Sequence, residues 1–216
     1  MPPNLKIPCA TPPQWRCLGR AKLAQPALYL ADHQDKLVII AQFARNLGVD
    51  AKTAAAYLDL LVDLYIVRRL PAWHANLGKR LVKSPKVYVR DSGLVHALLA
   101  IPDKETLLAH PVVGQSWECM VIENLLIATG KAQGYFYRTS GGAEIDLLLA
   151  WPDNSLWAVE IKRSLSPKLE RGFHAACEDL APARKFVVYP GQERYPLAKD
   201  IEAISLSELA TLLAES

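Results

Sequence analysis

The pattern of hydrophobic and polar positions predicts two adjacent helices in the first part of the chain. Apolar residues recur at helical spacing over residues 37–44, and Gly48 ends the run. Asp50 is placed to cap a second helix, whose apolar stripe extends from Ala54 to Tyr65. Two helices joined by a short glycine-containing turn are typical of a helix-turn-helix.

A pair of strands is expected after these helices, over residues 65–71 and 86–91. Helices followed by a hairpin predict a winged helix over residues 36–92. Residues 1–35 are rich in proline, so we expect a loosely structured arm, or the remnant of a larger protein, with room for a short helix over residues 21–31.

The second part of the chain alternates between the helical period and the strand period. We expect helices over residues 94–100, 112–129, 167–180 and 205–215, and strands over residues 135–139, 143–150, 156–162 and 185–189. Gly130 ends the longest of these helices. The order predicts an α/β sandwich over residues 93–216, so the predicted fold class is α/β with a winged helix at its N-terminal side.

Charged residues interrupt the apolar strands of residues 134–164, where an ordinary strand would not need them. Asp146 lies in one apolar strand and Glu160 in the next, and alternation places Glu160 and Lys162 on one face. If the strands are neighbours, the two carboxylates and the lysine meet. Glu144 precedes Asp146 by two residues and shares its side, so it either joins this site or faces solvent.

A surface ion pair is the alternative interpretation of Glu160 and Lys162, with Asp146 facing solvent at a sheet edge. Exposed pairs of this kind contribute only about 0–1 kcal/mol to stability. The apolar surroundings in both strands favour an assembled site instead, because charges buried beside core strands need a partner or a metal.

Composition is that of a soluble globular protein with one or two domains. The chain has 216 residues, of which 51% are hydrophobic and 22% charged. No apolar run is long enough to span a bilayer and no secretory signal is recognisable, so a cytoplasmic location is expected and no membrane partner. The four cysteines lack metal-ligand spacing and are interpreted as reduced thiols: Cys9, Cys17, Cys119 and Cys177.

The distribution of positive charge is more informative than the net charge of +3. The second helix offers Lys52 against Asp59 and Asp63, so base reading in a DNA groove is not expected. The predicted wing is different, since seven cations precede its first acidic residue: Arg68, Arg69, Lys79, Arg80, Lys83, Lys86 and Arg90. These side chains are candidates for contacts to the DNA backbone. Alternatively, the module packs against a protein domain and these charges are a solvated surface.

Three short motifs resemble the PD-(D/E)XK nuclease superfamily. They are GQSWE at residues 114–118, GAEID at residues 142–146 and VEIK at residues 159–162. The wider order, with YLDLLVDLYIVRRLPAW and KSPKVYVRDSGLVHALL preceding them, is similar to the C-terminal half of a family of bacterial and archaeal AAA+ ATPases. In that family, a nuclease-like domain of uncharacterised function follows the ATPase core and its winged helix.

The resemblance implies specific roles for the charged residues. Asp146, Glu160 and Glu118 would bind Mg²⁺ or Mn²⁺, and Lys162 would act on the water that attacks phosphorus. Glu144 would be auxiliary, and Glu123 is a substitute for Glu118.

The chain departs from the ATPase family in one respect. It contains no GxxxxGK[ST] motif, so we expect no nucleotide-binding residues and no ATP hydrolysis. Two functional hypotheses remain. One is a metal-dependent enzyme that cleaves phosphodiester bonds in DNA, and the other is a non-catalytic module that binds DNA or protein and acts with a separate ATPase.

Overall fold

The computed structural model describes residues 20–33, 36–37, 40–74, 81–82 and 84–216. The expectations for Cys9, Cys17, Lys79, Arg80 and Lys83 fall outside these residues. Among the described residues, no helix has both the length and the apolar character that a bilayer crossing requires.

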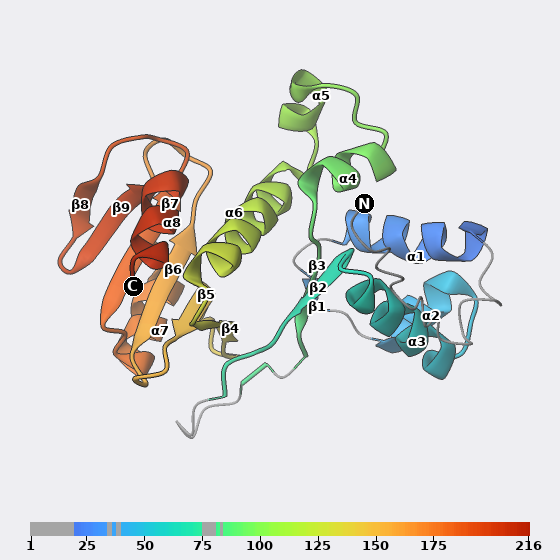
Figure 1. Ribbon diagram of the computed structural model, residues 1–216, viewed down its shortest axis with the longest axis horizontal. Helices are drawn as coiled ribbons and strands as arrows, with labels where there is room; N and C mark the ends of the chain where they lie inside the picture. The colour runs from blue at the N-terminus through green and yellow to red at the C-terminus, as the bar shows by residue number, and fades with distance from the viewer. Residues whose placement is uncertain (1–19, 34–35, 38–39, 75–80, 83) are drawn as a thin grey trace, which may run out of the picture.

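The N-terminal module combines four helices with a small antiparallel sheet (Figure 1). Its elements are α1 (Arg20–Asp32), β1 (Lys36–Leu37), α2 (Ile40–Leu47), α3 (Ala51–Asp63), β2 (Val67–Leu70), β3 (Lys86–Val89) and α4 (Ser92–Leu98). The sheet order is β1-β3-β2. Leu30, Phe43, Leu58 and Val87 are buried in one core that joins helices and sheet. The predicted pair of helices and the two strands after it are therefore present.

The turn between α2 and α3 forms as its sequence predicts. Gly48 has a φ of +64°, a left-handed conformation that glycine adopts without a steric penalty. The Asp50 carboxylate then accepts a hydrogen bond from the Thr53 amide at 2.9 Å, which caps α3.

Three expectations for this module were wrong. Residues 20–32 form the short helix considered from the sequence and not a loose arm, because Leu30 and Ala31 of α1 are buried against the other helices. Leu37 belongs to β1 and pairs with β3 rather than starting a helix. Tyr65 is not part of the apolar stripe of α3: its φ of +59° reverses the chain after the helix, and 77% of the residue is exposed.

The second part of the chain is a six-stranded mixed sheet with helices on both faces (Figure 1). Its strands are β4 (Gln133–Arg138), β5 (Glu144–Ala150), β6 (Leu156–Ile161), β7 (Arg184–Tyr189), β8 (Tyr195–Ala198) and β9 (Ile201–Ser205). The order is β4-β5-β6-β7-β9-β8; β4, β5 and β6 pair antiparallel, whereas β6, β7 and β9 run parallel. The sequence did not predict β8 or β9.

Helices α6 (Val113–Thr129) and α8 (Leu206–Ala214) cover one face of this sheet, and α7 (Arg171–Leu180) covers the other. Leu147 and Leu149 of β5 belong to the core under α6, and Leu148 belongs to the core under α7. The short helix α5 (Lys104–Ala109) connects α4 to α6 and buries none of its own residues. The coarse α/β expectation is thus confirmed.

Main-chain hydrogen bonds join the N-terminal module to the large sheet along the edge of β4 that does not pair with β5. The Phe136 amide donates to the Pro71 carbonyl at 3.0 Å, and Phe136 accepts from the Trp73 amide at 2.7 Å. On the returning segment, the Val82 amide donates to the Arg138 carbonyl at 3.0 Å. The segments flanking the β2–β3 loop therefore run along the large sheet, which fixes the N-terminal module against it.

Candidate functional site

The candidate site lies where β5 and β6 stop pairing. Their ladder runs from Ala150 opposite Leu156 to Leu147 opposite Val159, and Asp146 and Glu160 are the next residues on each strand. Beyond this point, a side chain takes over from the backbone ladder: the Asp146 carboxylate accepts a hydrogen bond from the Ile161 amide at 2.8 Å. Asp146 and Glu160 therefore lie together at the end of the paired region of β5 and β6.

A bulge in β5 sets the direction of Asp146. Along β4 the partners Tyr135 and Tyr137 are two residues apart, but they face Leu148 and Ile145, which are three residues apart. The extra residue lies in the segment that contains Asp146. Bulges of this kind redirect side chains, and they are common beside functional sites.

Glu160 and Lys162 lie on one face of β6, as strand alternation predicts. Lys162 Nζ is 2.9 Å from Glu160 Oε1 and 3.0 Å from Glu170 Oε1, at the start of α7. Glu160 is only 6% exposed, so the pair is not the surface ion pair considered from the sequence. Glu170 had no recognisable signal in the sequence, because its approach to Lys162 depends on how α7 packs.

Burial, and after it the negative charge of neighbouring carboxylates, favours the protonated form of Glu160. Burial, together with the charges of Asp146 and Glu144, raises the pKa of Glu160 to about 8, although Lys162 acts in the opposite direction. Burial lowers the pKa of Lys162, but the Glu160 carboxylate and the hydrogen bonds to Glu160 and Glu170 raise it overall. The net shift of the Glu160 pKa is upward because the carboxyl is buried and one lysine, shared with Glu170, does not balance the charges of Asp146 and Glu144.

The surroundings of Glu160 favour the binding of a proton or a cation to its carboxylate. Glu160 Oε2 is buried, and no described residue donates a hydrogen bond to it. A buried carboxylate oxygen without a partner is costly unless a proton or a cation binds there. Among the described residues, no group of three His, Cys, Asp or Glu side chains is already arranged around a metal position. Mg²⁺ commonly binds one or two carboxylates and completes its shell with water and phosphate, so Asp146 and Glu160 are the residues that could hold it.

Glu118 is connected to this region through a lysine of the N-terminal module. Lys86 Nζ of β3 lies 3.3 Å from Glu118 Oε1 and 3.6 Å from Glu144 Oε1. The Tyr88 hydroxyl also donates to Glu118 Oε1 at 3.1 Å. Alternation in β3 places Lys86 and Tyr88 on one face, but the sequence gives no sign that this face meets Glu118.

Glu123 has a different set of partners from the other candidate carboxylates. Arg68 of β2 donates through both Nε and a terminal nitrogen, the latter to Glu123 Oε2 at 3.0 Å. Arg90 Nε donates to the same Oε2 at 2.7 Å. Glu123 therefore clamps α6 to the N-terminal module and does not join the Asp146–Glu160 cluster.

The expected contacts to the DNA backbone need revision where their side chains are described. Lys86 is 1% exposed, so its ammonium is not presented to an external phosphate. Arg68 forms part of the clamp on Glu123, and Arg69 pairs with Asp59 of α3 at 2.6 Å. Much of the apparent wing charge thus serves contacts within the molecule.

The thiols match the expectation where they are described. Cys119 and Cys177 are both buried thiols. Burial raises the pKa of Cys177 to about 11, which keeps this thiol protonated near neutral pH.

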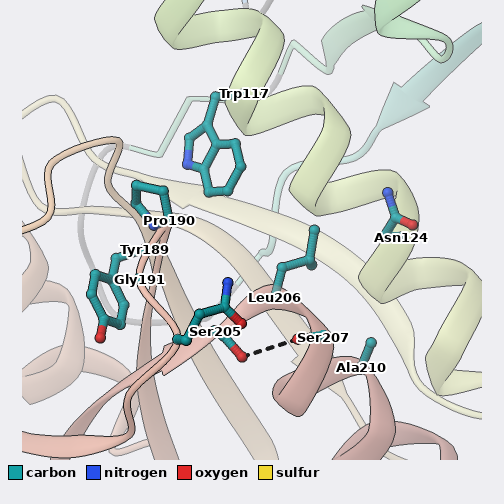
Figure 2. A pocket seen from close by; sticks show the side chains of 10 residues that line it. Trp117, Asn124, Tyr189, Pro190, Gly191, Ser205, Leu206, Ser207 and Ala210 are labelled. Atoms are coloured by element: carbon teal, nitrogen blue, oxygen red, sulfur yellow. Dashed lines mark hydrogen bonds between the residues drawn. The ribbon is translucent and has the colours of Figure 1, made fainter.

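A separate cavity of about 330 Å³ lies between α6, α8 and the end of β7. Figure 2 shows Trp117 of α6 facing it across from Leu206, with Pro190 and Gly191 beside it. The Ser205 and Ser207 hydroxyls at its floor are 3.2 Å apart. None of the candidate carboxylates lines this cavity, so it is not part of the site described above.

The fold and the site define a mixed α/β protein with a helical N-terminal module and a buried carboxylate–lysine cluster. Two family models match it, both described as domains of unknown function: DUF8612 over residues 19–105 and DUF4143 over residues 113–209. Uncharacterized protein Rv2008c of Mycobacterium tuberculosis is 40% identical over 182 residues, and so is uncharacterized protein Mb2031c of Mycobacterium bovis. The match covers 84% of this chain and 41% of each relative, so the chain spans about two fifths of their length.

One solved structure is distantly similar. Protein VC1899 from Vibrio cholerae has 14% sequence identity and a TM-score of 0.31, over 90% of this chain and 49% of that one. A likeness at this level carries no argument about function.

Proposed function

We propose that this chain is a metal-dependent, DNA-processing protein that cleaves phosphodiester bonds. In this proposal the N-terminal module is a winged helix, and the sheet with its helices is a nuclease-like domain of the PD-(D/E)XK type, related to a domain that follows AAA+ ATPase cores. The order of elements supports both assignments. The observation that carries the proposal is the buried Glu160 next to Asp146 and Lys162, whose Oε2 has no donor within the described part of the chain.

Asp146 and Glu160 would hold Mg²⁺ or Mn²⁺ at the end of the β5–β6 ladder. The ion, when bound, supplies neutralisation of phosphate charge and a more acidic water. The bulge and the Ile161 amide orient Asp146, and Glu170 restrains Lys162. Lys162 then offers a fixed ammonium that stabilises negative charge developing on phosphate oxygens. Lys86 bridges Glu118 and Glu144, and Glu144 precedes Asp146 by two residues on β5.

The direct test is a cleavage assay on plasmid, single-stranded and branched DNA with Mg²⁺ or Mn²⁺. We expect cleavage by the unmodified protein and its loss in Asp146→Asn and in Lys162→Ala. The matched controls are Glu178→Gln, on the exposed side of α7, and Lys199→Ala, in the exposed turn between β8 and β9. Cleavage that survives both site changes contradicts the enzyme proposal, and so does the absence of cleavage by the unmodified protein with Mg²⁺ and with Mn²⁺.

A non-catalytic binding module is the second candidate function. The observation in its favour is that Lys162, Lys86, Arg68 and Arg90 all have carboxylate partners inside the molecule. Binding of DNA or of an ATPase without turnover would then be the activity. DNA binding that weakens steeply with salt, with no product under either metal, is the result expected for this candidate.

A further inference from the structure

Lys86 belongs to the N-terminal module, but its buried ammonium lies among residues of the large sheet domain. It belongs to β3 of the N-terminal module and is 1% exposed. Its ammonium lies 3.3 Å from Glu118 on α6 and 3.6 Å from Glu144 on β5, and 5.5 Å from the centroid of the Phe136 ring on β4. Three elements of the large sheet domain therefore surround one charge that the N-terminal module supplies.

Packing alone does not require a charge at this position. An ammonium removed from water is expensive unless carboxylates and hydrogen bonds compensate it, and an apolar side chain at this position would carry no such cost. The position instead matches what a bound cation would do. It sits between a carboxylate of α6 and a carboxylate of β5, two residues along β5 from Asp146.

We propose that Lys86 is a resident cation of the carboxylate site, which holds Glu118 beside Glu144 and takes the place of a second divalent ion. Lys86 is thus a positioning residue, and the site is completed by a module outside the sheet domain. A divalent ion is then needed only at Asp146 and Glu160. That the carboxylates form a metal site rests on the proposed function, but the test of Lys86 depends only on the charges around it.

Removal of the ammonium should expose the vacancy that it fills. In Lys86→Met, Glu118 keeps the Tyr88 hydroxyl and Glu144 keeps a partly exposed arginine, Arg138, 3.5 Å away. The two carboxylates then flank a position from which the charge of Lys86 has been removed. Lys86→Arg retains that charge and serves as the conservative variant.

The experiment is a calorimetric Mn²⁺ titration, supported by thermal unfolding with Mn²⁺ and with EDTA. We expect Lys86→Met to melt several degrees below the unmodified protein in EDTA, to bind an additional Mn²⁺ ion and to regain most of the lost Tm with Mn²⁺. Lys86→Arg should show neither the added ion nor the rescue. The double variant Lys86→Met with Glu118→Gln should lose the added ion, because one of its two carboxylates is gone.

A Lys86→Met variant that gains no Mn²⁺ relative to the unmodified protein overturns the inference. If this variant does not fold in EDTA, the same titration is followed by circular dichroism, and failure of Mn²⁺ to restore folding overturns it equally. Failure of the proposed function has a different signature: Glu160→Gln then leaves Mn²⁺ binding unchanged, whatever Lys86→Met does.

Discussion

Glu123 and Glu160 are two buried glutamates with opposite surroundings. Their side chains are equally covered, at 8% exposed each. Both oxygens of Glu123 accept hydrogen bonds, from Arg68 and Arg90. Glu160 uses only Oε1, toward Lys162, while no described residue donates to its Oε2. One carboxylate is fully satisfied by the protein and the other is left incomplete.

This difference separates a structural charge from a candidate functional one. Two arginines compensate Glu123, so its charge contributes to the contact between α6 and the N-terminal module. Glu160 is buried beside further carboxylates, and burial first, with their charges second, raises its pKa to about 8. A site of this second kind is incomplete until a proton or a cation arrives.

Breaking the satisfied carboxylate should give the largest loss of stability. Glu123→Gln leaves Arg68 and Arg90 facing a neutral amide, and removal of one partner from a buried charge cluster costs about 3–5 kcal/mol. We expect the free energy of unfolding in urea to fall by about 3 kcal/mol at pH 7. A loss no larger than that of a surface substitution would show that the two glutamates do not differ as described.

Changing the incomplete carboxylate should have the opposite effect at alkaline pH. The folded-state pKa of Glu160 lies above its ordinary value of 4.5, so the folded protein holds this proton more tightly than the unfolded chain. The resulting stability is complete below about pH 4.5 and is lost as the pH rises through about 8. In EDTA, the free energy of unfolding should fall by up to about 1.4 kcal/mol per pH unit in this window.

The matched variant for that window is Glu160→Gln, which cannot titrate. We expect its stability to lack this slope and to exceed that of the unmodified protein by a margin that grows as the pH rises from about 4.5 to about 8. Urea unfolding at several pH values measures both curves. Parallel curves for the two proteins would mean that Glu160 is not the titrating group.

Tyr88→Phe should produce a smaller change on the N-terminal side of the site. The substitution removes the hydroxyl that donates to Glu118 at 3.1 Å and leaves the buried ring in place. A hydrogen bond to a charged group contributes about 1.5–3 kcal/mol, and Lys86 remains beside Glu118, so we expect a loss of about 1.5 kcal/mol. Thermal unfolding measures it, and an unchanged Tm would remove Tyr88 from the network.

The smallest effect should come from the exposed ion pair of the N-terminal module. Arg69 and Asp59 lie 2.6 Å apart, but the aspartate side chain is 58% exposed. Solvent screens such pairs, and Asp59→Asn should change stability by no more than about 1 kcal/mol. The same urea titration used for Glu123→Gln makes this variant its control.

The sequence predicted the elements whose pattern is local, and it placed Glu160 beside Lys162. The cap at Asp50 and the end of α6 at Gly130 were predicted because each depends only on residues nearby in the sequence. The edge strand β8 was missed because its residues alternate only between half-buried and exposed, and β9 was missed because it owes its place to pairing between β7 and β8.

The partners of Glu118 and Glu123 lay beyond what sequence reasoning could reach. Lys86 and Arg68 precede them by 32 and 55 residues, and their approach depends on how the β2–β3 hairpin lies along β4. The same long-range packing explains why cations expected at a DNA-facing surface are engaged inside the molecule. Helical spacing alone could say only that Glu118 and Glu123 point in different directions.

The central claim is that Glu160 is a cation-binding carboxylate, and a calorimetric Mn²⁺ titration at pH 7.5 tests it most directly. The unmodified protein and the α7 control Glu178→Gln should bind Mn²⁺ equally, and Glu160→Gln should weaken binding by about tenfold or more. Equal Mn²⁺ binding by Glu160→Gln and the unmodified protein, or no binding by either, would contradict the account.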